Sequence, residues 1–118
     1  MLKPGKDIFG KSEDLADRLD DIVSKLIVEF DPQKILLFGS YARGDFKSTS
    51  TMDILIVADT PMIFTERIKK ALLCCRGGFP PIEPIIYTPE EYKVLLEEAE
   101  EAFLTDALSE GIVVYEKE

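Results

Sequence analysis

A single acidic residue interrupts the second of two strongly apolar runs in this chain. Asp53 lies near the start of Met52–Val57, and all the remaining residues of this run are apolar. A carboxylate that enters a buried strand needs a metal or a hydrogen-bonding partner, because burying an unpaired charge is costly. Alternation along the strand places Asp53 on one face with Thr51 and Leu55. Asp53 therefore predicts a metal or ligand site at the start of this strand; the alternative is a capping or solvent-facing carboxylate at a sheet edge.

The first apolar run, Ile35–Phe38, is followed directly by Gly39 and Ser40. Glycine allows a ligand to approach the backbone closely, and a serine at the start of a helix offers a hydroxyl and an amide to phosphate. Two interpretations remain open: a phosphate-binding turn, or an ordinary turn between a strand and a helix. Arg43, three residues after Ser40, could neutralise phosphate charge or could form a surface ion pair with Asp45 or Asp53.

Hydrophobic periodicity predicts an α/β (α+β) protein with a mixed β-sheet and helices packed on it. The connection between the first two strands spans about a dozen residues, which favours antiparallel or mixed pairing. We expect one domain, residues 1–118, with residues 1–11 as a loose N-terminal arm. Pro84 predicts an edge strand or a bulge, since proline cannot donate to a ladder. The predicted elements are helices at 12–30, 41–43, 60–75, 89–99 and 103–108 and strands at 34–38, 52–58, 82–87 and 112–115.

The net charge of −9, from 14 basic and 23 acidic residues, argues against direct nucleic-acid binding. A basic protein partner is compatible with this charge, and the glutamate-rich segment 97–101 would either attract such a partner or form a solvated helix face. The apolar runs are too short to cross a membrane. The adjacent Cys74 and Cys75 are poorly arranged for a disulfide, and the N-terminus has no secretion signal. These features predict a cytoplasmic protein.

The segments Leu37–Asp45 and Ser50–Val57 together resemble the signature of the polymerase β-type nucleotidyltransferases. More narrowly, they resemble the minimal nucleotidyltransferases, small prokaryotic proteins often partnered with a helical HEPN toxin in toxin–antitoxin systems. The similarity extends through residues 85–92 and 107–115. It implies the nucleotidyltransferase fold, ATP as substrate and two Mg²⁺ ions.

In that family a Gly-Ser element binds the triphosphate, and here it falls on Gly39 and Ser40. An Asp-x-Asp pair on the second strand holds both metals, and its second member falls on Asp53. A third carboxylate on a following strand completes one metal site and helps to activate the attacking hydroxyl, and this position falls on Glu83. The resemblance thus implies that Asp53 and Glu83 are the catalytic, metal-binding residues.

The sequence departs from the family pattern at the first aspartate of the pair, where it has Thr51. A neutral hydroxyl is a weak magnesium ligand beside a carboxylate, so the metal site should be weakened. Two classes of function follow. In one, the protein transfers AMP from Mg-ATP to a partner protein, a HEPN-type toxin, as an antitoxin. In the other, it is a catalytically inactive antitoxin or nucleotide-binding subunit that acts by protein–protein binding.

Overall fold

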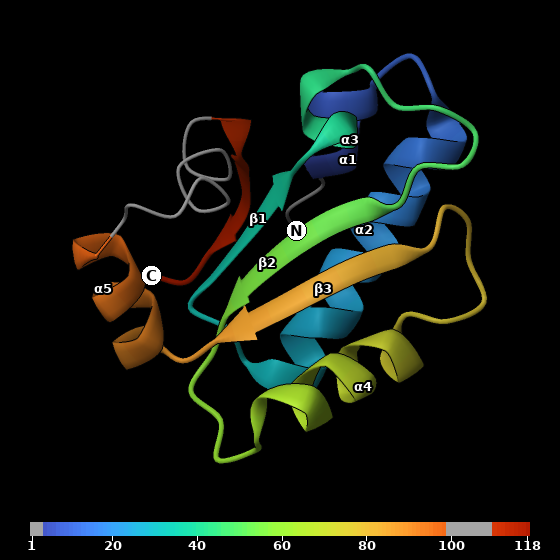
Figure 1. The fold of residues 1–118 in the computed structure, drawn as a ribbon. Coiled ribbons are helices and arrows are strands. Elements are labelled where there is room, and N and C mark those ends of the chain that lie inside the picture. The colour runs from blue at the N-terminus through green and yellow to red at the C-terminus, as the bar shows by residue number, and fades with distance from the viewer. Residues whose placement is uncertain (1–3, 99–109) are drawn as a thin grey trace.

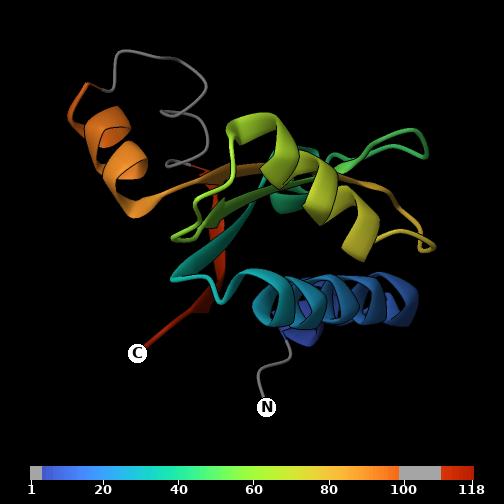
Figure 2. The ribbon, with the colours of Figure 1, turned by 90° about the horizontal axis from the view of Figure 1, so that it is seen from below.

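The computed structural model describes residues 4–98 and 110–118, which form helices on both faces of one sheet (Figures 1 and 2). In chain order the elements are α1 (Pro4–Phe9), α2 (Glu13–Phe30), β1 (Lys34–Phe38), α3 (Ser40–Arg43), β2 (Met52–Val57), α4 (Phe64–Cys74), β3 (Ile82–Tyr87), α5 (Pro89–Glu97) and β4 (Ile112–Glu116). The helix predicted at residues 103–108 lies outside the described residues. Among the described helices, none is long and apolar enough to cross a membrane.

The sheet has four strands in the order β3-β2-β1-β4. Strand β1 pairs antiparallel with β2 and with β4, whereas β2 and β3 are parallel. The predicted mixed sheet is therefore confirmed. The prediction for Pro84 is also confirmed, because β3 is an edge strand and needs no N–H at that residue for a second neighbour.

One face of the sheet packs against α2 and α4. Helix α2 turns Leu19, Ile22 and Leu26, all fully buried, toward the strands at helical spacing. It ends at Asp31, which adopts a left-handed conformation with φ 45°, directly before Pro32. Helix α4 contributes Ala71 to the same core.

The opposite face carries a smaller apolar cluster. Leu36, Leu55 and Val57 pack there against Tyr92 and Leu95 of α5. Because side chains alternate along a strand, Asp53 shares this face with Leu55 and Val57. The face thus has an apolar part under α5 and an acidic part at the start of β2.

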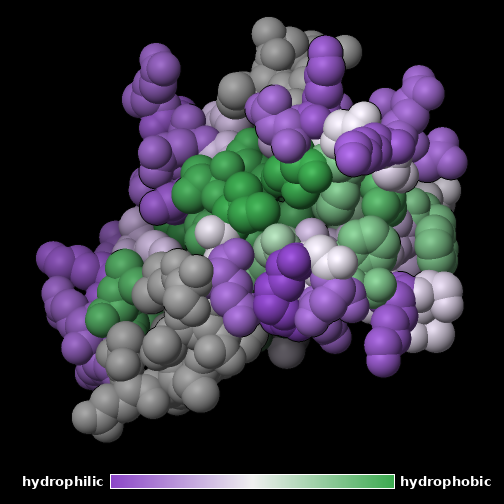
Figure 3. Space-filling model, turned by 90° about the horizontal axis from the view of Figure 1, so that it is seen from above, coloured by the Kyte–Doolittle hydropathy of each residue, from purple (hydrophilic) through white to green (hydrophobic). Residues whose placement is uncertain are grey.

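The N-terminal residues differ from the expected loose arm, because Pro4–Phe9 form α1 and pack on α2. A β-carbon at Gly5 would overlap the backbone of Ala16, so the missing side chain lets the two helices approach closely. Phe9 is buried and meets the ring of Tyr41 edge to face, with centroids 6.2 Å apart. Phe46 stacks on the same tyrosine at 4.2 Å. Seen from above, this end of the molecule shows an apolar area bordered by hydrophilic side chains (Figure 3).

Helix α4 begins at Phe64 rather than near residue 60 as predicted. The Thr60 hydroxyl accepts a hydrogen bond from the Met62 N–H at 3.2 Å, so this threonine closes a turn ahead of the helix. Ile63, with extended backbone, is the residue that precedes the first helical turn. The sequence signal at Thr60-Pro61 was therefore a turn signal.

Candidate active site

Asp53 and Glu83 face each other across the parallel β2–β3 ladder. They are partners in register, and Phe38 of β1 lies opposite Asp53 on its other side. The two carboxyl groups are hydrogen-bonded to each other. Both line a small pocket of about 180 Å³ whose other walls are apolar, formed by Phe38, Ile68, Pro84 and Ile85. The fold thus brings together the two acidic residues that the sequence proposed for one site.

The environment of Asp53 raises its pKa to about 7, well above the ordinary value of 3.8. Burial is the largest cause, followed by the hydrogen bond to Glu83 and the charge of Glu83; the charge of Arg43 opposes the rise. Two carboxylates that share a partly buried position repel each other once both are ionised. A divalent cation between them would remove that repulsion.

Gly39 brings the end of β1 against Asp53. Its φ of 73° lies in the region that favours glycine, and a β-carbon there would overlap Oδ2 of Asp53. No other residue type would fit without moving the carboxylate. Ser40 follows as the first residue of α3, which has only four residues, so its helix dipole is small. Phosphate binding at this turn would depend on the backbone of Gly39 and on the hydroxyl and amide of Ser40.

Thr51 stands beside this pair at the position of the absent aspartate. Its Oγ1 lies 3.5 Å from Oε2 of Glu83, which is long for an O–H···O hydrogen bond. The side chains of Thr51, Asp53 and Glu83 therefore meet at one end of the sheet. They supply two carboxylates and one hydroxyl.

Arg43 forms ion pairs on the surface near the site. Its Nη1 lies 2.8 Å from Oε2 of Glu110, and its Nε lies 3.3 Å from Oδ1 of Asp45. The pair with Asp45 was one of the two interpretations of Arg43 from the sequence. The contact with Glu110 was missed, because the two residues are 67 positions apart and no local pattern links them.

The donor set fits one magnesium ion that arrives with a phosphate. Magnesium takes hard oxygen ligands, and in phosphoryl-transfer sites one or two carboxylates commonly share it with the substrate phosphates and water. Within residues 4–98 and 110–118, no cluster of three or more Asp, Glu, His or Cys side chains could enclose a metal. Asp53 and Glu83 would therefore hold the ion only together with substrate oxygens. Their assignment as metal ligands stays a prediction.

Comparison with known proteins identifies the family. The nucleotidyltransferase domain family matches residues 16–108, most of the chain. The chain belongs to this family. Two similar proteins of Methanocaldococcus jannaschii are named "Putative protein adenylyltransferase", MJ0604 and MJ0141. The first is 36% identical over 83 residues, covering 70% of this chain and 78% of its own. The second is 37% identical over 57 residues, covering 46% and 58%.

Solved structures agree with the fold. A "putative nucleotidyltransferase from Sulfolobus solfataricus" superposes with a TM-score of 0.59 at 19% identity, covering 97% of this chain and 85% of the other. A "toxin-antitoxin with AMP-PNP" superposes with a TM-score of 0.56 at 18% identity, covering 84% and 73%. At these identities the likeness establishes the nucleotidyltransferase fold, as the resemblance of the sequence had implied.

Proposed function

We propose that this nucleotidyltransferase-family protein transfers AMP from Mg-ATP to a partner protein, and that the partner is a HEPN-type toxin which it counteracts as an antitoxin. The observation that carries the proposal is the meeting of Asp53 and Glu83 beside the Gly39 turn. The name of the M. jannaschii relatives supports a protein as acceptor. The toxin–antitoxin structure with AMP-PNP supports both an adenine nucleotide and a toxin partner.

Each residue has a role in this reaction. Gly39 leaves room for the triphosphate, and Ser40 donates hydrogen bonds to its oxygens. Asp53 and Glu83 would hold Mg²⁺, which when bound would neutralise phosphate charge and make the attacking hydroxyl more acidic. The acceptor oxygen forms a bond to the α-phosphorus, the bond from that phosphorus to the bridging oxygen breaks, and pyrophosphate leaves. Glu83 is exposed, so it is placed to accept the proton of the acceptor hydroxyl.

Arg43 would have to give up an ion pair before it could contact the nucleotide. Its guanidinium is held by Asp45 and Glu110, so it must leave at least one carboxylate to reach a phosphate oxygen. Because the pairs are largely exposed, this exchange costs little. Arg43 therefore contributes less than Gly39 and Ser40 to nucleotide binding in this proposal.

The second candidate function is binding without catalysis. Thr51 in place of an aspartate favours it, because the neutral hydroxyl leaves the site with two carboxylates. Losing a metal-binding carboxylate can cost about a thousandfold in rate, equivalent to about 4 kcal/mol. In that case the protein is an inactive antitoxin or a nucleotide-binding subunit.

Label transfer from α-labelled ATP separates the two functions. The wild-type protein, Thr51→Asp and Asp53→Ala are incubated with Mg²⁺ in a lysate of the source organism, with γ-labelled ATP as a parallel control. Label on a discrete protein band from α-labelled ATP alone, lost in Asp53→Ala, supports adenylyl transfer. Label that appears only with Thr51→Asp supports a disabled natural site. No label from any of the three, in a lysate that contains the acceptor, supports binding without catalysis.

A further inference from the structure

A second recess, away from Asp53 and Glu83, opens between α4, β3 and α5. Its volume is about 420 Å³, and four of its six lining residues are aliphatic or aromatic: it is lined by Phe64, Tyr87, Glu90, Glu91, Val94 and Leu95. Val94 is 48% exposed and Phe64 is 38% exposed. The ring of Phe64 packs against Tyr87 with centroids 5.8 Å apart. We call this recess the α4–α5 groove.

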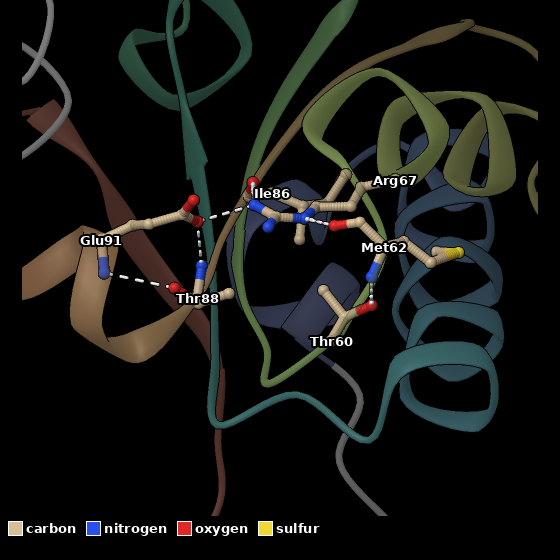
Figure 4. Close-up of polar contacts among 6 residues, drawn as sticks. All are labelled: Thr60, Met62, Arg67, Ile86, Thr88 and Glu91. Atoms are coloured by element: carbon tan, nitrogen blue, oxygen red, sulfur yellow. Dashed lines mark hydrogen bonds and ion pairs between the residues drawn. The ribbon is translucent and has the colours of Figure 1, made fainter.

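A buried arginine fixes the walls of the α4–α5 groove (Figure 4). Arg67 of α4 donates from Nε to the Met62 carbonyl at 2.8 Å and from Nη1 to the Ile86 carbonyl at 3.2 Å. The same Nη1 lies 2.6 Å from Oε1 of Glu91 on α5. Glu91 also accepts from the Thr88 N–H, as half of a capping box. The groove is therefore formed before any partner arrives, which lowers the entropic cost of binding.

One wall of the groove, formed by Tyr87 and α5, lies on the same face of the sheet as the acidic pair. Glu83 and Tyr87 are four residues apart on β3, so alternation directs both to one face. At about 3.3 Å per residue, they are separated by about 13 Å along the strand. A protein segment that sits in the groove can therefore extend along this face toward Asp53.

The charge around the groove favours a cationic partner. Residues 89–98 contain four glutamates and one lysine, in a chain of net charge −9. Glu91 is neutralised by Arg67, but Glu90 is exposed at the rim, and the described residues show no ion pair to it. An apolar recess with an unpaired carboxylate at its edge is complementary to an apolar side chain flanked by Lys or Arg.

We propose that the α4–α5 groove is the docking site for the protein acceptor, and that it takes an amphipathic segment with an apolar side chain between Phe64 and Val94 and a basic side chain beside Glu90. The inference rests on the proposed function for its acceptor. It adds where that acceptor binds and what chemistry the acceptor carries.

Two helical probe peptides test the docking site. Both have about 18 residues and the same leucine positions on one face; one carries lysine and the other glutamate on the opposite face. Fluorescence anisotropy of the labelled peptides is measured at physiological ionic strength. We expect the lysine peptide to bind and the glutamate peptide not to bind. Val94→Lys should weaken binding of the lysine peptide by about tenfold or more.

Matched variants locate the binding. Val28→Lys makes the same change at a residue of α2 that is 83% exposed, and it should leave the affinity unchanged. Glu90→Lys should weaken binding several-fold, whereas Glu13→Lys, also in a first helical turn, should have no comparable effect. If Val94→Lys changes the thermal melt, Val94→Ser serves in its place. Equal losses at Val28 and Val94, equal binding of both peptides, or a self-association that Val94→Lys abolishes would each overturn the proposal.

The catalytic variant keeps the two proposals apart. Asp53→Ala should retain full affinity for the lysine peptide, because it changes the other end of the strand pair. If label transfer fails for every variant while Val94→Lys still releases the peptide, the catalytic function is wrong and the groove stands. If label transfer succeeds equally in wild type and Val94→Lys, the acceptor does not use the groove.

Discussion

The two ends of the parallel β2–β3 pair carry clusters of charged side chains that differ in how their charges are balanced. At the start of the pair, Asp53 meets Glu83, and among the described residues neither carboxylate has an ion-pair partner. At the far end, buried Arg67 pairs with Glu91 and with two backbone carbonyls. Both clusters are anchored on β3 or on the turn that follows it. They differ in whether the charges are balanced by the protein itself.

This difference is the one expected if the acidic pair binds a ligand and the arginine cluster supports the fold. Burial and the proximity of Glu83 raise the pKa of Asp53, so ionising the pair works against the folded state. The guanidinium of Arg67 lowers the pKa of Glu91, so ionisation there supports the folded state. Residues at binding sites commonly cost stability in the absence of their ligand. Variants at the two ends of the strand pair test this contrast.

Asp53→Asn should have the largest effect. The amide keeps the size of the side chain but removes one of the two carboxylates proposed to bind the metal, so the proposed Mg²⁺-dependent adenylyl transfer should fall about a thousandfold, or about 4 kcal/mol. The same change should raise the urea midpoint at pH 8 without Mg²⁺, because it removes the repulsion with Glu83. Asp59→Asn, at an exposed residue after β2, is the control and should change neither quantity. A loss of both activity and stability would argue against a ligand site.

Arg67→Met should destabilise the fold by about 3 kcal/mol. The Arg67 side chain is 8% exposed, and its loss leaves the Met62 and Ile86 carbonyls and the Glu91 carboxylate without their donor. Urea denaturation measures the change. Lys69→Met, at an exposed residue of the same helix, should stay within about 0.5 kcal/mol of wild type. Equal stability of the two variants would mean that the Arg67 cluster is not a structural support.

Thr51→Asp should increase the negative charge beside Asp53 and Glu83. A third carboxylate near Glu83 should tighten Mg²⁺ binding about tenfold, equivalent to about 1.4 kcal/mol, and should lower stability in the metal-free state. Calorimetric titration with Mg²⁺ and a thermal melt without it give the two numbers. Thr49→Asp adds the same charge in the exposed loop and serves as the control. Unchanged Mg²⁺ affinity in Thr51→Asp would mean that Mg²⁺ does not bind beside Thr51.

Much of the acidic end could be predicted from sequence, because its signals are local. An aspartate in an apolar strand and a glycine after another strand each indicate a special environment. Pro84 predicted an edge strand or a bulge, and β3 is an edge strand. Glu83 came from the family resemblance alone, since nothing in its own neighbourhood marks it. Its position opposite Asp53 depends on the parallel register, which periodicity does not specify.

The other end was missed, because its partners are distant in sequence. Arg67 and Glu91 are 24 residues apart, and an arginine within a helical pattern looks like any exposed cation. Glu110 could not be recognised as a partner of Arg43 for the same reason, because the two residues are 67 positions apart. Helix α1 was missed for another reason: Pro4 and Gly5 suggest a loop, but Gly5 instead permits close packing on α2. Side chains and glycines that act through tertiary contact leave little trace in a local pattern.

The pH dependence of stability should reveal the acidic end directly. Unfolded Asp53 releases its proton near pH 3.8 and folded Asp53 near pH 7, so the folded state holds more protons between these values. The contribution of Asp53 to stability should therefore be lost as pH rises from about 4 to 7, by about 1 kcal/mol after solvent screening. Without metal, the urea midpoint of wild type should fall relative to that of Asp53→Asn as pH rises, and should lie below it by pH 8. A constant difference across the range would contradict the raised pKa.

Glu91→Gln should give the smallest effect and the opposite slope. The glutamine keeps an acceptor for the Thr88 N–H but loses the charge that pairs with Arg67, so stability at pH 7 should fall by about 1 kcal/mol or less. Glu91 has a lowered pKa, so its contribution is present above the ordinary value of 4.5 and is lost as pH falls through the lowered value. The stabilities of wild type and Glu91→Gln should therefore converge in acid. Glu90 does not pair with Arg67, so Glu90→Gln should differ less from wild type in stability at every pH. If the Asp53 and Glu91 contributions changed with pH in the same direction, the two ends of the strand pair would not be balanced differently, and the acidic end would lose its distinction as a ligand site.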